Sequence, residues 1–169
     1  MMLIFPALGQ ETINNFHSEN QQIIWESVFE TQLQFVQLSR IIKESGLFDN
    51  LEVTENKLTG MMKDMDADFK GAGLTELSTP IYIARSYVRG FAIVEYKDGK
   101  YRAQLKKIIL IQKYNDALSQ HGQTTNLESF ALKKGTNEIK NAFKKSPSLI
   151  LDHTFQTRFQ FASDTKKDW

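Results

Sequence analysis

The sequence predicts an α+β domain in which a strand and a helix precede four strands and a further set of helices. An Asp98-Gly99 pair stands between two runs that alternate apolar and polar residues, which is the strongest short-range indication of a β-hairpin. Apolar residues also recur at helical spacing in 33–45 and again after Ser146-Pro147. Long strands and amphipathic helices in one chain of this length favour a sheet covered by helices.

The composition is that of a globular chain with its own core. Of the 169 residues 41% are hydrophobic, and the nine glycines bring the apolar total near the roughly 45–50% of ordinary domains. The absence of cysteine excludes disulfide scaffolds, thiol catalysis and cysteine-based zinc sites. No stretch approaches the ~18 consecutive apolar residues of a membrane-spanning helix.

The charge is unevenly distributed between the two halves of the chain. Residues 1–84 carry 5 basic and 12 acidic side chains (−7), and residues 85–169 carry 16 and 8 (+8), which sum to the formal net charge of +1. Such asymmetry can mark a tail that binds nucleic acid or a membrane. We favour mutual attraction of the two halves within one domain, because the basic residues are spread through periodic segments instead of one run.

The N-terminus resembles the end of a signal peptide. An apolar run, Met1 to Phe5, is followed by Pro6 and by Ala7-Leu8-Gly9, a small-x-small pattern that signal peptidase accepts. The basic region is missing and the apolar stretch is short, so we expect an upstream start codon and cleavage between Gly9 and Gln10. The alternative is an ordinary apolar segment that docks on the core.

The first half of the chain predicts a strand, a helix and a hairpin. Residues 23–30 form a strand with Ile23, Trp25 and Phe29 inward, and 33–45 form an amphipathic helix that ends at Gly46. Segments 51–54 and 57–59 flank Glu55-Asn56, where asparagine tolerates the left-handed conformation of a two-residue turn. The second arm continues toward residue 69, and its change of parity at residues 61–62 indicates a β-bulge there.

The Asp98-Gly99 turn fixes a register for the next two strands. Its geometry pairs residue 96 with 101, 95 with 102 and 94 with 103, which places Tyr96, Tyr101 and Ala103 on one face. Residues 108–111 are apolar on both faces, so the strand should end between two covered surfaces.

The C-terminal region predicts helices. Thr125 with Glu128 matches a capping box, Thr136 opens a segment with inward apolar residues at 139, 142 and 143, and Ser146-Pro147 starts the last helix.

The order of elements, together with five sequence segments between residues 23 and 111, resembles a known family. Those stretches are Ile24-Trp25 with Glu30-Thr31, Lys43 to Phe48, Asp66 to Gly73, Ser78 to Arg85, and Tyr96 to Tyr101. They are similar to the domains of unknown function with a TBP-like fold from exported proteins of Gram-negative bacteria. The resemblance implies a curved antiparallel sheet with helices on one face, an exported protein, and no catalytic residues.

We therefore divide the chain into three parts. These are a signal-peptide remnant and lead-in (1–22), a TBP-like α+β domain (23–112), and a C-terminal helical extension that packs on the same domain (113–169).

The best candidate for a ligand site is the long connection from residue 70 to 88. It interleaves aromatic and cationic side chains, Tyr82, Arg85, Tyr87 and Arg89, which can grip an acidic or sugar-like ligand or stack on bases. The competing interpretation is a short extra strand that buries residues 81 and 83 and displays the polar side chains.

A metal site is the weaker candidate. Asp64, Asp66 and Asp68 match the start of a calcium loop, but Phe69 and Thr75 stand where that loop needs glycine and glutamate. Alternation along a strand would instead place the three carboxylates on one solvated face. The glycines at 71 and 73 lack the third glycine of a phosphate cradle, and the three histidines match no catalytic motif.

These observations favour a protein of unknown biochemical function that is a non-enzymatic, exported binding module of the cell envelope. We expect no cofactor, no membrane span and no nucleic acid, and a protein or glycan partner in the periplasm or at the outer membrane. A small metal-assisted hydrolase using one of the aspartates with a histidine is one alternative. A nucleic-acid-binding domain, by analogy of fold and from the basic second half, is another; a cytoplasmic location would favour it.

Overall fold

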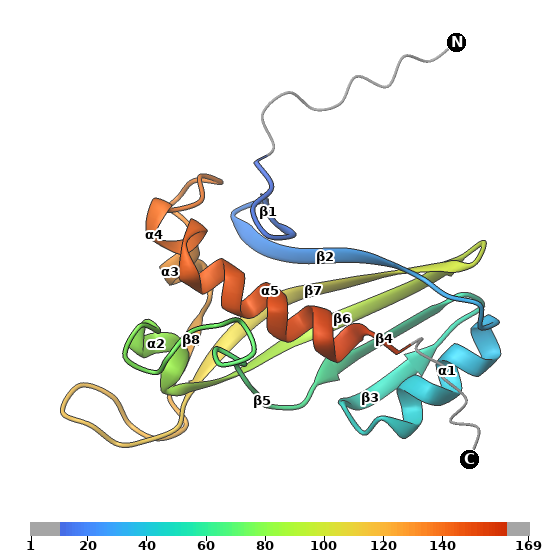
Figure 1. The fold of residues 1–169 in the computed structure, drawn as a ribbon, viewed down its shortest axis with the longest axis horizontal. Coiled ribbons are helices and arrows are strands. Elements are labelled where there is room, and N and C mark those ends of the chain that lie inside the picture. Colours follow the sequence, from blue (N-terminus) through green and yellow to red (C-terminus); the bar gives the residue numbers. More distant parts are fainter. Residues whose placement is uncertain (1–10, 162–169) are drawn as a thin grey trace, which may run out of the picture.

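The protein is described from a computed structural model, which places residues 11–161. An antiparallel sheet forms the centre, and the helices lie against it (Figure 1). Within the described chain the strands are β1 (Phe16–Glu19), β2 (Gln22–Glu30), β3 (Phe48–Val53), β4 (Lys57–Met62), β5 (Met65–Asp66), β6 (Ser86–Lys97), β7 (Lys100–Gln112) and β8 (Thr124–Asn126). The helices there are α1 (Phe35–Glu44), α2 (Ile81–Ala84), α3 (Glu128–Ala131), α4 (Asn141–Lys144) and α5 (Ser146–Phe159).

The β6–β7 hairpin is the middle of the sheet and has the predicted register. Tyr96 pairs with Tyr101, and the pairs on either side follow as the Asp98-Gly99 turn requires. Both turn residues have positive φ, 49° and 75°, as a type I′ turn needs. The strands lie in the order β1-β2-β7-β6-β4-β3, while β5 pairs with β6 and β8 with β7.

A bulge in β7 explains how its apolar second half is buried. The pairing with β6 shifts between Arg89 and Phe91, and Lys107 takes up the extra residue with a φ of 50°. Beyond it, Ile108 and Leu110 face the core, as Leu105 does before it. The other face of this stretch carries residues 109 and 111, and β8 pairs alongside it.

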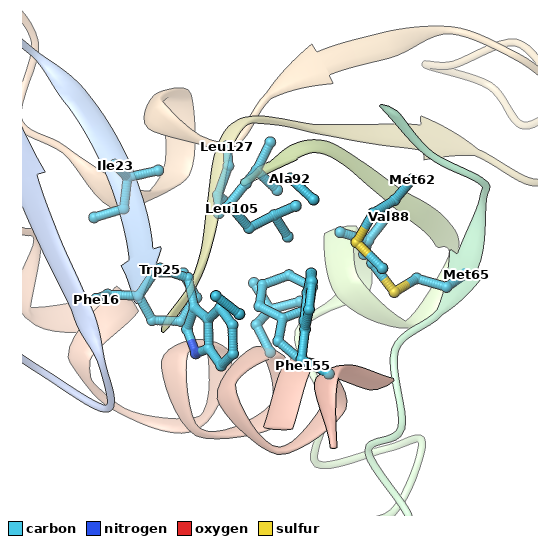
Figure 2. Close-up of a cluster of buried hydrophobic side chains, with 14 of the residues drawn as sticks. Phe16, Ile23, Trp25, Met62, Met65, Val88, Ala92, Leu105, Leu127 and Phe155 are labelled. Atoms are coloured by element: carbon cyan, nitrogen blue, oxygen red, sulfur yellow. The ribbon is translucent and has the colours of Figure 1, made fainter. Parts of the chain in front are cut away.

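The core lies between one face of the sheet and the helices α1 and α5. Figure 2 shows the part of it around Trp25 and Phe155 of α5. Trp25 of β2 lies 5.5 Å from the ring of Phe155 and 5.4 Å from that of Phe159, both on α5. Leu38 of α1 and Tyr101 of β7 belong to the same buried cluster. The C-terminal helix therefore shares one core with the strands, and the opposite face of the sheet carries no long helix within residues 11–161.

The predicted lead-in contributes to the sheet. Residues 16–19 form β1, which pairs with β2, and Phe16 is fully buried against Phe143 with ring centroids 5.2 Å apart. The domain thus begins before residue 23. The expected cleavage point between Gly9 and Gln10 lies outside the described residues.

The β3–β4 hairpin forms where predicted, but two details were wrong. The extra residue lies in β3, between Asp49 and Glu52, and Asn50 takes the left-handed conformation with a φ of 51°. Residues 58, 60 and 62 of β4 are all buried, so β4 keeps one parity and has no bulge at 61–62. Asn56 is not among the residues with positive φ, so its tolerance of that conformation is not what forms the turn. The arm also ends at Met62, and pairing resumes only in β5.

The C-terminal region is less helical than predicted before residue 146. Thr125 lies in β8 and caps nothing, while the Glu128 carboxylate accepts a hydrogen bond from the backbone N–H of Ile23 (3.1 Å). Thr136 sits in a turn, not at a helix start, and its hydroxyl donates to the Lys133 carbonyl. The last helix begins at Ser146 with proline in its first turn, as predicted.

Ion pairs join the two oppositely charged halves. Of the seven between Lys or Arg and Asp or Glu in residues 11–161, four link the acidic half to the basic half. These four are Glu11 with Lys144, Glu26 with Arg102, Asp64 with Arg89, and Asp66 with Lys113. The charge asymmetry therefore serves contacts within the domain, as we expected.

Candidate functional site

A hollow of about 580 Å³ lies at one end of the sheet, on the side that faces the core. Its floor is formed where β6, β7 and β8 meet, because Ser86 pairs with Gln112 and Leu110 pairs with Thr125. Helix α2, the 113–123 connection and α3 form its walls, and these elements lie together at one end of the molecule (Figure 1). Its volume is in the range of about 300–1,000 Å³ that small-molecule and peptide-side-chain sites occupy.

Two stacked aromatic rings form one wall of the hollow. Tyr82 of α2 lies on Phe130 of α3 with ring centroids 4.0 Å apart and planes 3° from parallel. Burial raises the pKa of the Tyr82 phenol to about 12, so the phenol is neutral and can donate a hydrogen bond at any physiological pH. Both residues pack against the hydrophobic core, which fixes the wall in place.

The rim of the hollow carries aliphatic side chains in water. Ile81 is 73% exposed and Leu118 is 93% exposed, and both line the opening. Isolated exposed aliphatic residues are ordinary, but two of them at the mouth of a hollow with an aromatic wall are typical of a binding surface.

The charged groups of the hollow are Arg85 and Asp116. The guanidinium of Arg85 lies 3.7 Å from the Asp116 carboxylate and 5.5 Å from the centre of the Tyr114 ring. The backbone N–H groups of Leu118 and Ser119 donate to Asp116 and hold the pKa of its carboxyl below its usual value, with a smaller contribution from Arg85. The hollow thus contains one cation and one firmly ionised carboxylate.

The four predicted ligand residues divide between the two faces of the sheet. Tyr82 and Arg85 line the hollow. Tyr87 and Arg89 point to the opposite face, where Lys113 Nζ lies 4.9 Å from the centre of the Tyr87 ring and Arg89 binds Asp64 at 2.6 Å. They alternate with the buried residues 86, 88 and 90 of β6, and this alternation separates them from the hollow.

The competing interpretation of residues 81–84 as an extra strand was wrong. These residues form the helical turn α2, in which Ile83 is buried and Ile81 is exposed. Pro80 precedes the turn with a φ of −55°, and the N–H groups of Ile83 and Ala84 both donate to its carbonyl. The helical turn places Tyr82 and Arg85 at one opening, because residues three apart share a face of a helix.

The three aspartates of the weaker candidate lie at the surface, each beside a different basic side chain. Asp64 binds Arg89, Asp66 binds Lys113, and Asp68 lies 3.2 Å from Nε2 of His153. No group of three or more His, Asp or Glu side chains between residues 11 and 161 is arranged to hold a metal ion.

A second hollow, of about 610 Å³, lies beside α5 and is lined by Asp66, Asp68, Lys70 and Arg158, among others. Asp68 also accepts a hydrogen bond from the backbone N–H of Gly71 (2.8 Å). A Cβ at Gly71 would come within 2.1 Å of the Asp68 carboxylate and 2.5 Å of His153 Nε2. Glycine is needed here for close approach to these two side chains, not for binding phosphate.

Sequence reasoning missed most of the first hollow, including Ser86, Leu110, Gln112, Asp116, Leu118 and Phe130. Asp116 could have been found from Asn115-Asp116 ahead of Ser119, because such residues bind the backbone N–H groups of their own turn. Phe130 gave no local indication, since its contact with Tyr82 depends on β8 returning the chain to β7.

None of the helices in the described part of the chain is long and apolar enough to cross a membrane.

No protein-family model and no curated protein matches the sequence. Among solved structures the chain is similar to a TBP-like protein from Parabacteroides distasonis, with 12% identity, a TM-score of 0.54, and coverage of 83% of this chain and 90% of that one. A DUF4468 family protein from Bacteroides ovatus gives 13% identity, a TM-score of 0.47, and coverage of 82% and 84%. The chain therefore has the TBP-like α+β fold predicted from the sequence. Export and a binding role stay predictions.

Proposed function

We propose that this protein is a non-enzymatic, exported binding module of the cell envelope that uses the hollow at the α2 end of the sheet to bind a partner protein. The observation that carries the proposal is the pair of exposed aliphatic side chains, Ile81 and Leu118, around a hollow with a fixed aromatic wall. A partner that covers this opening would remove both side chains from water, which is the main favourable term in most protein association.

The second candidate function is a small hydrolase, and one contact favours it. Asp68 lies 3.2 Å from His153 at the side of the second hollow, as in a pair where a carboxylate orients a general base. The pair has the geometry of an ordinary surface ion pair as well, and Asp68 is already used to hold the 68–71 turn. We therefore rank the binding module first.

The test of the binding module has a location arm and a contact arm. The native, untagged protein is fractionated and its intact mass measured; a mass beginning at Gln10 in the periplasmic or outer-membrane fraction is expected. A photo-crosslinking residue is then placed at Leu118 in the native host, with Leu149 of α5, another exposed leucine, as the matched control. We expect one discrete crosslinked envelope protein from position 118 and none from position 149.

If the protein is found in the cytosol with an intact mass that includes Met1, the proposal of export is overturned and nucleic-acid binding becomes the leading alternative. Identical crosslinking patterns from the two positions would overturn the assignment of the surface. For the hydrolase, a His153→Ala variant that loses activity on generic ester or phosphoester substrates would move that function to first place.

A further inference from the structure

The guanidinium of Arg85 has an ion pair with Asp116 but no direct hydrogen bond within the described residues. Its distance of 3.7 Å from Asp116 exceeds the roughly 2.7–2.9 Å of a charge-assisted hydrogen bond. The side chain is 37% exposed and lines the hollow. A guanidinium offers five N–H donors in a planar fork that matches a carboxylate.

Asp116 does not use these donors, because its own loop satisfies it. Its Oδ1 accepts hydrogen bonds from the backbone N–H groups of Leu118 (2.9 Å) and Ser119 (2.7 Å), and its Oδ2 accepts one from Gln112 (3.2 Å). Asp116 therefore shapes the 113–123 connection, and Arg85 is left available for a second carboxylate.

The Ser86 hydroxyl next to Arg85 opens into the hollow. Ser86 lines the hollow, and its Oγ makes no hydrogen bond to another described residue. The one buried side-chain polar atom without a partner among the described residues is Ser39 Oγ, so the Ser86 hydroxyl stays accessible from the hollow. A ligand that brings a main-chain N–H or C=O to this hydroxyl can form a hydrogen bond with it.

The surface around these polar groups is apolar. The Tyr82 ring, stacked on Phe130, lines the same hollow as the exposed aliphatic residues Ile81 and Leu118. A ligand that fits must therefore carry an anionic group next to an aliphatic or aromatic one.

We propose that the hollow binds an acidic segment of a partner protein in which a carboxylate side chain is flanked by aliphatic residues. The carboxylate accepts two hydrogen bonds from Arg85, the neighbouring aliphatic side chain packs against Tyr82 under Ile81 and Leu118, and a main-chain group of the segment pairs with Ser86. This inference rests on the proposed function, since it names the chemistry of the partner at that site. A peptide is favoured over a sugar because a sugar would leave the exposed aliphatic rim in water.

The test compares two capped tripeptides, N-acetyl-Leu-Glu-Leu-amide and its Gln counterpart, titrated into the full chain and followed by methyl and amide NMR. We expect shifts at Ile81 and Leu118 and about fivefold tighter binding of the Glu peptide at low salt, as for a partly exposed ion pair. High salt should shrink the preference.

Matched variants separate the charge from the fold. Arg85→Gln should abolish the preference for Glu, while Arg89→Gln, an arginine of similar exposure on the opposite face, should keep it. Ser86→Ala should weaken both peptides equally, by about threefold, because a neutral hydrogen bond is lost and the charge is not.

Equal binding of the two peptides, or a preference that survives Arg85→Gln, would overturn the proposal. Binding of an oligouronate at the same resonances without either peptide would overturn it in favour of an acidic sugar. A specific crosslink at position 118 together with equal peptide binding would leave the proposed function standing and refute only this inference. A preference of the purified chain for the Glu peptide, without any specific crosslink at position 118 in cells, would leave the peptide chemistry of the hollow standing and refute the proposed function.

Discussion

Asp152→Ala should destabilise the protein by removing the only side-chain acceptor that the described residues offer to a buried indole. Asp152 lies on α5, and its Oδ1 accepts hydrogen bonds from Nε1 of Trp25 and Nδ2 of Asn15, each at 2.8 Å. Trp25 is fully buried, so its N–H would lose its partner away from water. This contact also ties the start of the chain to the last helix.

The size of the effect follows from these contacts. Leaving a buried donor unsatisfied costs about 1–3 kcal/mol, and hydrogen bonds to a charged acceptor are worth about 1.5–3 kcal/mol. Asp152 is itself only half-buried, so we expect a net loss of about 2–3 kcal/mol. In a chain of this length that corresponds to a fall in Tm of about 4–12 °C. Alanine has the higher helix propensity, which opposes the loss slightly.

The assay is urea unfolding followed by far-UV circular dichroism, with Asp152→Asn as the matched control. Asparagine keeps an oxygen acceptor of the same shape, so it should lose less than half as much free energy of unfolding as alanine. An alanine variant within 0.5 kcal/mol of the wild type, or an asparagine variant as unstable as the alanine one, would refute the reasoning.

Three further outcomes are expected. Tyr101→Phe should cost about 1–3 kcal/mol in urea unfolding, because the buried hydroxyl donates to the Phe159 carbonyl (2.7 Å) and accepts from the backbone N–H of Phe161 (3.0 Å); wild-type stability would contradict this. Burial raises the pKa of Tyr82 and of Tyr101 from 10 to about 12, so their neutral forms add stability that is complete below pH 10 and lost between pH 10 and 12. Absorbance titration should show Tyr82 and Tyr101 ionising well above pH 10, and ionisation of both near pH 10 would contradict this. Gly90→Ala should cost about 1–3 kcal/mol by thermal melting, since its Cβ would lie 2.8 Å from Leu105 Cγ. An unchanged Tm would contradict this and show that β7 shifts to make room for the methyl group.

The parts of the fold that local chemistry determines were predictable. The register of β6 and β7 followed from the Asp98-Gly99 turn, because positive φ at both residues is compatible with only one kind of two-residue hairpin. Helix α5 followed from proline in its first turn and from apolar residues at 151, 155 and 159, all fully buried.

The errors lie where distant contacts override local preference. Thr125 and Glu128 have the spacing of a capping box, but β8 pairs Thr125 with Leu110, and Glu128 serves the backbone of β2. The bulge was assigned to β4 because its sequence changes pattern there, whereas a bulge can lie on either strand of a pair. Pairing and bulge position depend on residues far apart in the chain, and one strand's sequence does not contain them.

The candidate site was half predictable for the same reason. Tyr82 and Arg85 share a helical turn, so their placement at one opening is a local property. The separation of Tyr87 and Arg89 was also contained in the sequence, because they alternate with small or apolar residues along β6. The lack of a direct hydrogen bond from Arg85 to Asp116 was not contained in the sequence, since it depends on how the 113–123 loop supplies hydrogen bonds to Asp116.

Two edges of the sheet are unfavourable places for strand addition. The outer edge of β3 carries Asp49 and Glu52 and is interrupted by the left-handed Asn50, features that discourage pairing with another strand. At the other side of the sheet, the part of β2 that lies beyond β1 ends at Glu30, next to the exposed Val28. Two copies of either edge would place like charges together, which is unfavourable. The hollow instead combines exposed apolar surface with the partly exposed guanidinium of Arg85, which makes no direct hydrogen bond within the described residues. The proposed docking at the hollow therefore does not depend on these two edges.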